Sequence, residues 1–237
     1  MIPTRRFRFL ICDLDDTLYP SDNGVAGCIR ERIGQFMVEY LDILPEQMPG
    51  IRSQLYAQYG TVMRGLMLHY GIDPEHYLEF VHDIPLANFI QPNPALNSVL
   101  ANIGLTKVIF TNASREHALR VLGILGLQHH FAHIIDVRDF QYHSKPHRYA
   151  YRRTLQILEA RPEECILVED MQRNLAPAMA MGMFGVLVHS NGETDGADLC
   201  IHDITELADK LGCGDPSLLP PSCHNRLYPQ LTSTLGL

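Results

Sequence analysis

The sequence predicts an α/β fold in which a parallel sheet lies between layers of helices, with an all-helical segment inserted after the first strand. Short apolar runs alternate with stretches of helical spacing between residues 94 and 211, which is typical of βαβ units. One more apolar run, at residues 8–14, precedes a long segment that shows helical spacing alone. Polar residues gather directly after several of these runs, where a parallel sheet carries its functional site.

The composition suits a folded chain with one core and a modest insertion. Of its 237 residues, 46% are hydrophobic and 19% are charged, so a sizeable core can form. Acidic residues outnumber basic ones by 27 to 19, which argues against binding a nucleic acid polymer through its phosphates. No apolar run approaches the roughly 20 residues needed to cross a bilayer. The apolar stretch after Thr4-Arg5-Arg6 is too short for an export signal, so we expect a cytoplasmic protein without a membrane partner.

The cysteines and histidines show no metal-binding or disulfide pattern. The six cysteines lie far apart, without a C-x-x-C pair, and the 12 histidines lack the spacing of a zinc site. Cys12 and Cys165 lie inside apolar runs. We therefore expect free thiols, several of them buried.

The first strand is expected within residues 8–14, where the side chains are apolar on both faces, as in a covered parallel strand. The segment from Gly24 to about His82 differs, because its apolar residues recur at helical spacing and prolines and glycines interrupt it. We expect four or so helices there and no strand.

The remaining elements complete a Rossmann-like three-layer core. Strands are expected at residues 107–110, 134–135, 165–168, 186–188 and 199–201. Helices are expected from Ser114 to Leu125, from Pro146 through Leu158, from Leu175 to Met181 and from Ile204 to Leu211. Four prolines follow Gly212, so the C-terminal residues 216–237 are expected to form an irregular tail.

Four segments are expected to bring polar side chains to one rim of the sheet. Asp13, Asp15 and Thr17 follow the first strand, Thr111-Asn112 and Glu169-Asp170 follow two others, and Lys145 precedes the helix at Pro146. Clustered carboxylates repel one another, and Mg²⁺ with its preference for oxygen ligands relieves this. A cation, a lysine and hydrogen-bond donors around a carboxylate suit phosphoryl transfer. As an alternative, Asp15 and Asp16 could cap a following helix that has Thr17 in its first turn, but this explains only those residues.

These residues resemble the motifs of the haloacid dehalogenase superfamily. D-L-D-D-T-L-Y-P, from Asp13, is similar to its first motif, Thr111-Asn112 to the second, Lys145 in S-K-P to the third, and V-E-D-M-Q-R-N, from Val168, to the fourth. The resemblance implies a core of residues 1–18 and 95–215 and a helical cap of residues 19–94. Within the superfamily, the segments Y-G at 59–60, R-G-L at 64–66, I-D-P at 72–74 and V-H-D at 81–83 look most like the pyrimidine 5′-nucleotidase group.

The resemblance assigns a role to each core residue. Asp13 would attack phosphorus and become an aspartyl-phosphate, and Asp15 would protonate the leaving oxygen and then activate water. Thr111 and the Asn112 region would hold phosphate oxygens. Lys145 would offset the charge of Asp13 and of the phosphate.

The resemblance also implies a Mg²⁺ cofactor. Asp13, the backbone carbonyl of Asp15 and Asp170 would bind it. Glu169 stands where an aspartate is commoner, as a direct ligand or as a residue behind the ligands. Asn174 could orient Lys145 or the loop, or be a solvated helix residue.

The implied function is a Mg²⁺-dependent phosphomonoester hydrolase, with pyrimidine nucleoside 5′-monophosphates as the first candidate substrates. Dehalogenase members lack the second acid, because a halide leaves without a proton, so Asp15 favours cleavage of a phosphate ester. A phosphatase or phosphomutase for sugar phosphates or other small phosphorylated metabolites is the alternative. A catalytically silent regulatory protein is a third possibility, against which the intact Asp13, Asp15, Lys145 and Asp170 argue.

The helical cap is expected to select the substrate. Arg64 and His82 are the residues predicted to read the leaving group, and other polar or aromatic cap residues of interest are Tyr59, His69, Tyr77 and Asp83. Each has a structural alternative: Tyr77 at helical spacing would belong to the core, and His82 and Asp83 would simply end a helix.

Overall fold

A computed structural model describes residues 7–188 and 196–212 and contains one parallel sheet. Its strand order is β3-β2-β1-β4-β5-β6, and every neighbouring pair is parallel. The strands are β1 (Phe9–Cys12), β2 (Thr106–Phe110), β3 (Phe131–Ile135), β4 (Cys165–Glu169), β5 (Phe184–Val188) and β6 (Leu199–Ile201). The predicted α/β fold is confirmed.

The strand order reverses at β1, and this places the functional site. After β1 the chain adds β2 and β3 on one side, and it then returns to add β4 on the other side. The two crossovers leave a crevice beyond the carboxyl ends of β1 and β4. Cys12 of β1 pairs with Val168 of β4, so Asp13 and Glu169 follow at the same level of the sheet.

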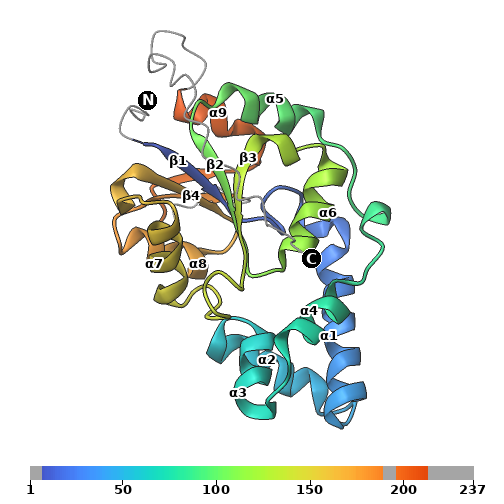
Figure 1. Ribbon diagram of the computed structural model, residues 1–237. Helices are drawn as coiled ribbons and strands as arrows, with labels where there is room; N and C mark the ends of the chain where they lie inside the picture. The colour runs from blue at the N-terminus through green and yellow to red at the C-terminus, as the bar shows by residue number, and fades with distance from the viewer. Residues whose placement is uncertain (1–6, 189–195, 213–237) are drawn as a thin grey trace, which may run out of the picture.

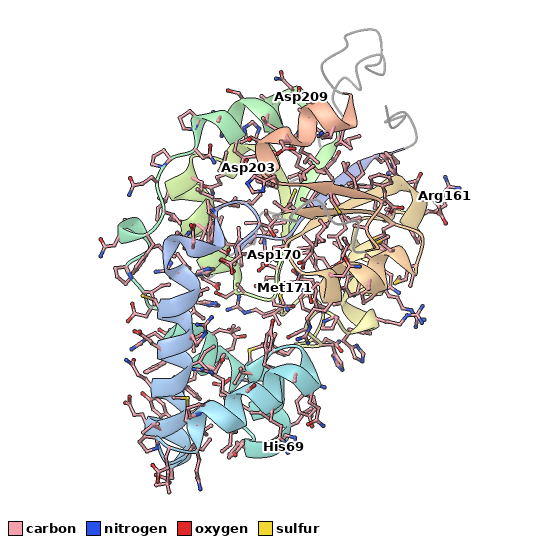
Figure 2. All side chains as sticks on the ribbon, turned by 180° about the vertical axis from the view of Figure 1, so that it is seen from behind. His69, Arg161, Asp170, Met171, Asp203 and Asp209 are labelled. Carbon is pink, nitrogen blue, oxygen red and sulfur yellow. The ribbon has the colours of Figure 1, made fainter. Side chains whose placement is uncertain are left out.

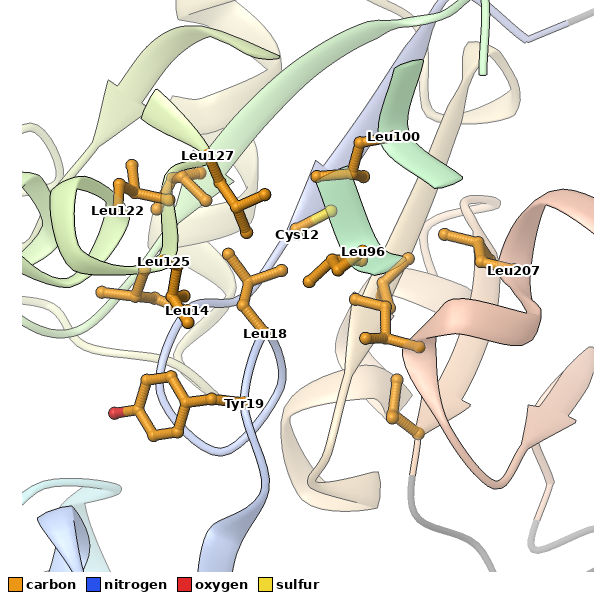
Figure 3. Close-up of a cluster of buried hydrophobic side chains, with 14 of the residues drawn as sticks. Cys12, Leu14, Leu18, Tyr19, Leu96, Leu100, Leu122, Leu125, Leu127 and Leu207 are labelled. Atoms are coloured by element: carbon orange, nitrogen blue, oxygen red, sulfur yellow. The ribbon is translucent and has the colours of Figure 1, made fainter. Parts of the chain in front are cut away.

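Two layers of helices cover the sheet, and alternate residues of β1 contact different layers. Leu10 and Cys12 belong to a cluster with α5 (Pro94–Asn102), α6 (Arg115–Leu125) and α9 (Leu207–Leu211). Figure 3 shows part of this cluster, in which Leu96 and Leu100 lie beside Cys12 and Leu207 lies farther to the right. Phe9 and Ile11 belong to the cluster of α7 (Arg148–Ile157) and α8 (Gln172–Met179). All four residues of β1 are buried, as expected for a strand covered on both faces.

The inserted segment forms four helices, as predicted, and it lies below the sheet in the view of Figure 1. They are α1 (Val25–Leu41), α2 (Met48–Tyr59), α3 (Val62–Tyr70) and α4 (Pro74–His82). The ring of Phe36 on α1 contacts those of Tyr77 and Phe80 on α4, with centroids 5.1 and 5.5 Å apart, so Tyr77 is a core residue. The cap boundaries at residues 19 and 94 stay a prediction.

The turn between α2 and α3 lies directly against the Lys145–Pro146 segment. A Cβ atom on Gly60 would be 2.6 Å from the carbonyl oxygen of Lys145 and 2.6 Å from Pro146 Cδ. Gly60 also has a φ of +85°, which favours glycine. Next to it, Thr61 Oγ1 donates a hydrogen bond of 3.1 Å to Ser144 Oγ. The absence of a side chain at Gly60 therefore lets the helical insertion dock beside Lys145.

Several element boundaries differ from the prediction. The helix expected from Pro146 begins at Arg148, because His147 has extended backbone and its Nδ1 accepts the N–H of Tyr149. The helix expected at 175–181 is α8, which begins and ends earlier. The helix expected from Ile204 starts as a 3₁₀ turn, Ile204–Glu206, before α9.

The cysteine prediction is confirmed for the described residues. Cys12, Cys28 and Cys165 are free, and Cys12 and Cys165 are buried. Cys213, Cys223 and the predicted tail of residues 216–237 lie outside the described ranges. None of the helices in those ranges combines the length and the apolar character that crossing a membrane requires.

Candidate active site

The predicted polar residues follow the carboxyl ends of neighbouring strands. Asp13 comes directly after β1, Thr111 directly after β2, and Glu169 and Asp170 lie at the end of β4. Figure 2 shows Asp170 and Met171 between the sheet and the helical insertion, whereas His69 lies at the far end of that insertion. The parallel sheet thus brings these segments to one rim, as the sequence predicted.

Lys145 lies at the centre of this rim, with an exposure of 1%. Its ammonium donates to Asp13 Oδ1 at 2.7 Å, to Glu169 Oε1 at 2.7 Å and to the carbonyl oxygen of Phe110 at 2.9 Å. Burial alone would lower the pKa of Lys145, but the carboxylates of Asp13 and Glu169 outweigh it and raise the pKa. An ammonium group has three N–H donors, so Lys145 is fully engaged.

The side chain of Asn112 holds the backbone of Lys145. Its Nδ2 donates to the carbonyl oxygen of Lys145 at 3.2 Å, and its Oδ1 accepts the N–H of Lys145 at 2.8 Å. Thr111 is buried beside it, and its Oγ1 accepts the N–H of Ala113. That bond leaves the hydroxyl hydrogen of Thr111 for an outside acceptor. Phosphate binding by Thr111 and Asn112 stays a prediction.

Asp13 is held by a donor on each carboxylate oxygen. Lys145 donates to Oδ1, and Thr17 Oγ1 donates to Oδ2 at 3.1 Å. Burial raises the pKa of Asp13 to about 7, although Lys145 acts in the opposite direction. The capping alternative for Thr17 is wrong, because the residues after Leu14 form a turn and Thr17 contacts Asp13.

Asp15 has a different environment from Asp13. Its Oδ1 accepts hydrogen bonds from the Tyr19 hydroxyl at 2.5 Å and from His117 Nε2 at 2.8 Å. Burial alone would raise the pKa of Asp15, but the interactions with His117 and Tyr19 outweigh it and hold the pKa at about 2. Asp15 also lines an open cleft beside the rim. It is therefore an oriented carboxylate that a ligand can reach.

Glu169 and Asp170 supply two further carboxylates to the rim. Glu169 is buried, and both of its oxygens are engaged, Oε1 by Lys145 and Oε2 by the N–H of Met171 at 3.0 Å. Burial and the negative charge of Asp13 raise the pKa of Asp170 to about 6. Asp13, Glu169 and Asp170 offer oxygens that all lie within 4.8 Å of one another. This is a possible cation site.

Asp16 is a further acidic residue at this rim, and the sequence suggested for it only the role of a helix cap. Its Oδ1 is buried and has no hydrogen-bond partner among the described residues. Burial and the charges of Asp15 and Asp13 raise the pKa of Asp16 to about 6. An unpartnered buried carboxylate oxygen next to other acids is the environment that a divalent cation relieves. The sequence signal that could have indicated Asp16 was its position as the third acid of D-L-D-D.

The cleft beside Asp15 and Asp16 has a volume of about 490 Å³ and a wall formed by the helical insertion. Arg30 and Ile33 of α1 and Arg52 and Tyr56 of α2 line it. Arg52 is half-buried, and its Nη1 donates to the carbonyl oxygen of Arg30 at 3.4 Å. The cleft therefore combines acidic groups on the sheet side with two arginines on the helical side.

Arg64 and His82, the predicted specificity residues, do not line this cleft. Arg64 lies in a neighbouring hollow, where its Nη2 is 3.4 Å from His143 Nε2. His82 is buried, its Nδ1 is 3.2 Å from Ser114 Oγ, and its ring stacks on that of His117. Burial and the neighbouring His117 lower the pKa of His82 to about 3. Selection by these two residues stays a prediction, and the cleft geometry favours Arg30 and Arg52.

The other predicted residues have structural contacts. Tyr59 and His69 contact each other, with 2.7 Å between the hydroxyl oxygen and Nε2. Asp83 follows α4 as its C-cap, and its carboxylate lies 3.8 Å from the guanidinium of Arg32. Asn174 is nearly buried, and its carbonyl oxygen accepts the hydroxyl of Tyr151. All three N–H donors of the Lys145 ammonium are used by other residues, so none is left for Asn174. Asn112 holds the backbone of Lys145 instead.

Comparisons with known proteins show what this chain resembles in sequence. A family model described as haloacid dehalogenase-like hydrolase matches residues 7–182. The chain is 25% identical over 202 residues to Phosphate metabolism protein 8 of Saccharomyces cerevisiae, which covers 79% of this chain and 62% of that protein. It is 31% identical over 119 residues to a Phosphoglycolate phosphatase of Chromobacterium violaceum, which covers 49% of this chain and 53% of that protein. The chain thus spans about half to three fifths of the length of these relatives.

Solved structures show the same fold at low sequence identity. A HAD phosphatase from Thermococcus onnurineus has a TM-score of 0.61 at 20% identity, covering 87% of this chain and 98% of that chain. The HAD-hydrolase YfnB from Bacillus subtilis, solved bound to magnesium, has a TM-score of 0.59 at 16% identity, covering 87% and 99%. The L-2-haloacid dehalogenase of Xanthobacter autotrophicus has a TM-score of 0.55 at 16% identity, covering 87% and 98%.

Replacing Lys145 should test the electrostatic centre of the site. We expect Lys145→Met to lower the free energy of unfolding by about 3–5 kcal/mol, because it leaves two buried carboxylates without their cation. Urea denaturation at pH 7 measures this. The control Lys210→Met, at an exposed position, should stay within about 0.5 kcal/mol of wild type. Adding Glu169→Gln to Lys145→Met should recover part of the loss, and no recovery would contradict the charge-balance explanation.

Proposed function

The chain belongs to the haloacid dehalogenase-like hydrolase family, and we propose that it is a Mg²⁺-dependent phosphomonoester hydrolase acting through an aspartyl-phosphate on Asp13. One observation carries this proposal. Asp13 is fixed by Lys145, while a second carboxylate, Asp15, lines the adjacent cleft. A halide leaves without a proton, but the oxygen of a phosphate ester needs one, so Asp15 favours ester hydrolysis over dehalogenation. Two curated relatives with phosphate-related names support this class of substrate.

In the first half-reaction, a carboxylate oxygen of Asp13 attacks phosphorus while the bond between phosphorus and the leaving oxygen breaks. Asp15 gives its proton to that oxygen, so an alcohol leaves. The Lys145 ammonium and the Thr17 hydroxyl orient the Asp13 carboxylate, since each donates to one of its oxygens. The hydroxyl of Thr111, whose oxygen accepts the N–H of Ala113, would donate its hydrogen to a phosphoryl oxygen.

In the second half-reaction, water attacks phosphorus of the aspartyl-phosphate. Asp15, now a carboxylate, takes the proton from that water, and the bond between phosphorus and Asp13 breaks. Free phosphate leaves, and Asp15 is protonated again for the next turnover. One group therefore acts as acid and then as base, which requires Asp15 to face the cleft in both steps.

The acidic residues fit a Mg²⁺ ion. Asp13, Asp170 and the backbone carbonyl of Asp15 would hold it. Asp16, whose Oδ1 has no hydrogen-bond partner among the described residues, is near enough for its charge to raise the pKa of Asp170. Mg²⁺ would supply positive charge to the phosphoryl group when bound. Glu169 serves Lys145 with one oxygen and a backbone N–H with the other, so we place it behind the ligands.

Replacing the two aspartates tests the covalent mechanism. We expect Asp13→Asn to abolish phosphate release from an aryl phosphate while the protein stays folded, because an amide is not a nucleophile. Asp15→Asn should lose about 10²–10⁴-fold in kcat, the usual contribution of a positioned acid and base. Mass spectrometry of the quenched Asp15→Asn protein should find phosphate on Asp13. Near-normal turnover by Asp13→Asn would contradict the mechanism.

Metal binding should stabilise the protein in a pH-dependent way. The pKa values of Asp13, Asp16 and Asp170 are raised from 3.8 to about 7, 6 and 6, so the metal-free protein loses stability as the pH rises from the ordinary aspartate value to these raised values. Mg²⁺ should therefore raise the Tm more at pH 8 than at pH 5.5, where protons compete for the same oxygens. Asp170→Asn should lose most of this shift.

Activity provides a second measure of the metal. Excess EDTA should abolish phosphate release by the wild type, and added Mg²⁺ should restore it. Full activity in EDTA, or an equal Tm shift in Asp170→Asn and wild type, would contradict the metal assignment.

We propose nucleoside 5′-monophosphates, pyrimidines first, as substrates. The cleft volume of about 490 Å³ lies in the range of small-molecule sites. Ile29 and Ile33 offer apolar surface to a base or sugar, and Arg30 and Arg52 offer donors to the carbonyl oxygens of a pyrimidine. The same arginines also fit a leaving group with a carboxylate, so a phosphatase or phosphomutase for other small phosphorylated metabolites is the alternative.

A comparison of two arginine variants tests the substrate proposal. We expect kcat/KM to be higher for UMP and CMP than for AMP, a hexose phosphate or phosphoglycolate. Arg52→Met should reduce that preference about 10- to 100-fold, as expected for loss of a hydrogen bond from a charged group. Arg64→Met should leave the ranking unchanged. If Arg64→Met alone changes the ranking, the sequence-based assignment of Arg64 is correct, and a wild-type preference for hexose phosphates would refute the nucleotide proposal.

A further inference from the structure

His117 is a buried residue that the motifs did not indicate. It lies on α6, in the same row as Ser114 and Arg120, and its side chain is completely buried. All three residues of this row contact the end of the helical insertion or Asp15. The ring of His117 therefore lies between Asp15, the proposed acid and base, and His82, the last residue of α4.

Two donors share one oxygen of Asp15. His117 Nε2 lies 2.8 Å from Oδ1, and the Tyr19 hydroxyl donates to the same oxygen at 2.5 Å. The His117 nitrogen must be the donor, because a carboxylate only accepts. Within the described ranges, Oδ2 of Asp15 has no hydrogen bond. Fixing Oδ1 in this way leaves Oδ2 as the oxygen free to exchange a proton with a ligand in the cleft.

His82 in turn fixes the ring of His117. The two rings stack with centroids 4.3 Å apart and an interplanar angle of 24°. His82 Nδ1 is 3.2 Å from Ser114 Oγ, and the carbonyl oxygen of His82 accepts a hydrogen bond from Arg120. Because His82 ends α4, the helical insertion closes one side of the pocket that holds His117.

We propose that His117 is a positioning residue for Asp15, and that His82 couples the docking of α4 to this role by holding the His117 ring. The inference rests on the proposed phosphomonoester hydrolysis. His117 does not touch the substrate; it keeps Asp15 Oδ2 aligned with the leaving oxygen. The contact between His82 and His117 then helps Asp15, on the core side of the cleft, to deliver its proton.

Leaving groups of different basicity separate this role from general support of the fold. The value of kcat/KM covers the steps through departure of the leaving group. Dinitrophenolate can leave without being protonated, whereas an alkoxide needs a proton from a general acid. His117→Leu should lower kcat/KM about 10²-fold for the primary alkyl phosphate that the wild type hydrolyses best, as expected when a catalytic group is misaligned. It should leave kcat/KM for 2,4-dinitrophenyl phosphate nearly unchanged.

Companion variants connect the effect to Asp15. His117→Gln keeps an N–H donor at a similar reach and should recover much of the loss on the alkyl phosphate. His82→Leu retains His117 but removes the stacked ring, so it should give the same substrate-dependent loss to a smaller extent. In an Asp15→Asn background, His117→Leu should cost nothing further. The control His130→Leu, whose histidine contacts Asn97 away from the rim, should match the wild type on both substrates.

Two outcomes would overturn the positioning role. One is an equal loss on both substrates by His117→Leu and His82→Leu. The other is the same fold-loss from His117→Leu in the wild-type and Asp15→Asn backgrounds. A wild type that releases phosphate from neither substrate would instead refute the proposed function, so the two failures are distinguishable. Melting temperatures of all variants show whether each protein is folded under the assay conditions.

Discussion

The site depends on one buried cation shared by two carboxylates. Lys145 can remain charged at an exposure of 1% only because Asp13, Glu169 and a backbone carbonyl accept all three of its N–H donors. These acceptors come from the ends of three strands, so the sheet register and the lysine position constrain each other. Asn112 fixes the backbone of Lys145 through two hydrogen bonds, and Gly60 allows the α2–α3 turn to pack on its carbonyl oxygen.

The helical insertion contacts the core on two sides of the same site. On one side, Gly60, Thr61 and Arg64 contact residues 143–146, the segment that contains Lys145. On the other side, His82 contacts α6 next to His117 and Asp15. The wall of the cleft is therefore positioned by contacts close to Lys145 and Asp15, two residues of the proposed mechanism. This arrangement requires a glycine at position 60 and buries His82 at the end of α4.

The sequence predicted those parts of the site that depend on strand order. Asp13, Thr111, Glu169 and Asp170 follow apolar runs, and parallel strands bring such residues to one edge whatever the side-chain packing. His117, Arg30 and Arg52 were not predicted, because their roles depend on how helices distant in sequence are rotated and packed. The same reason applies to the cap: helical spacing predicted four helices, but which polar side chains face the cleft follows from tertiary contacts. The start of α7 differed because the side chain of His147, directly after Pro146, caps the helix.

The two carboxylates proposed for the chemistry are biased in opposite directions in the ligand-free protein. The attack requires Asp13 as a carboxylate, yet burial raises its pKa to about 7, whereas Asp15 must carry a proton and has a pKa of about 2. The charges of the reactants would oppose both biases. A divalent cation beside Asp13 would act in the same direction as Lys145 and favour the carboxylate. A phosphate dianion next to Asp15 would favour its protonated form, because two negative charges at short range repel. In the proposed mechanism, the reactive protonation states would therefore be favoured only when both partners are bound.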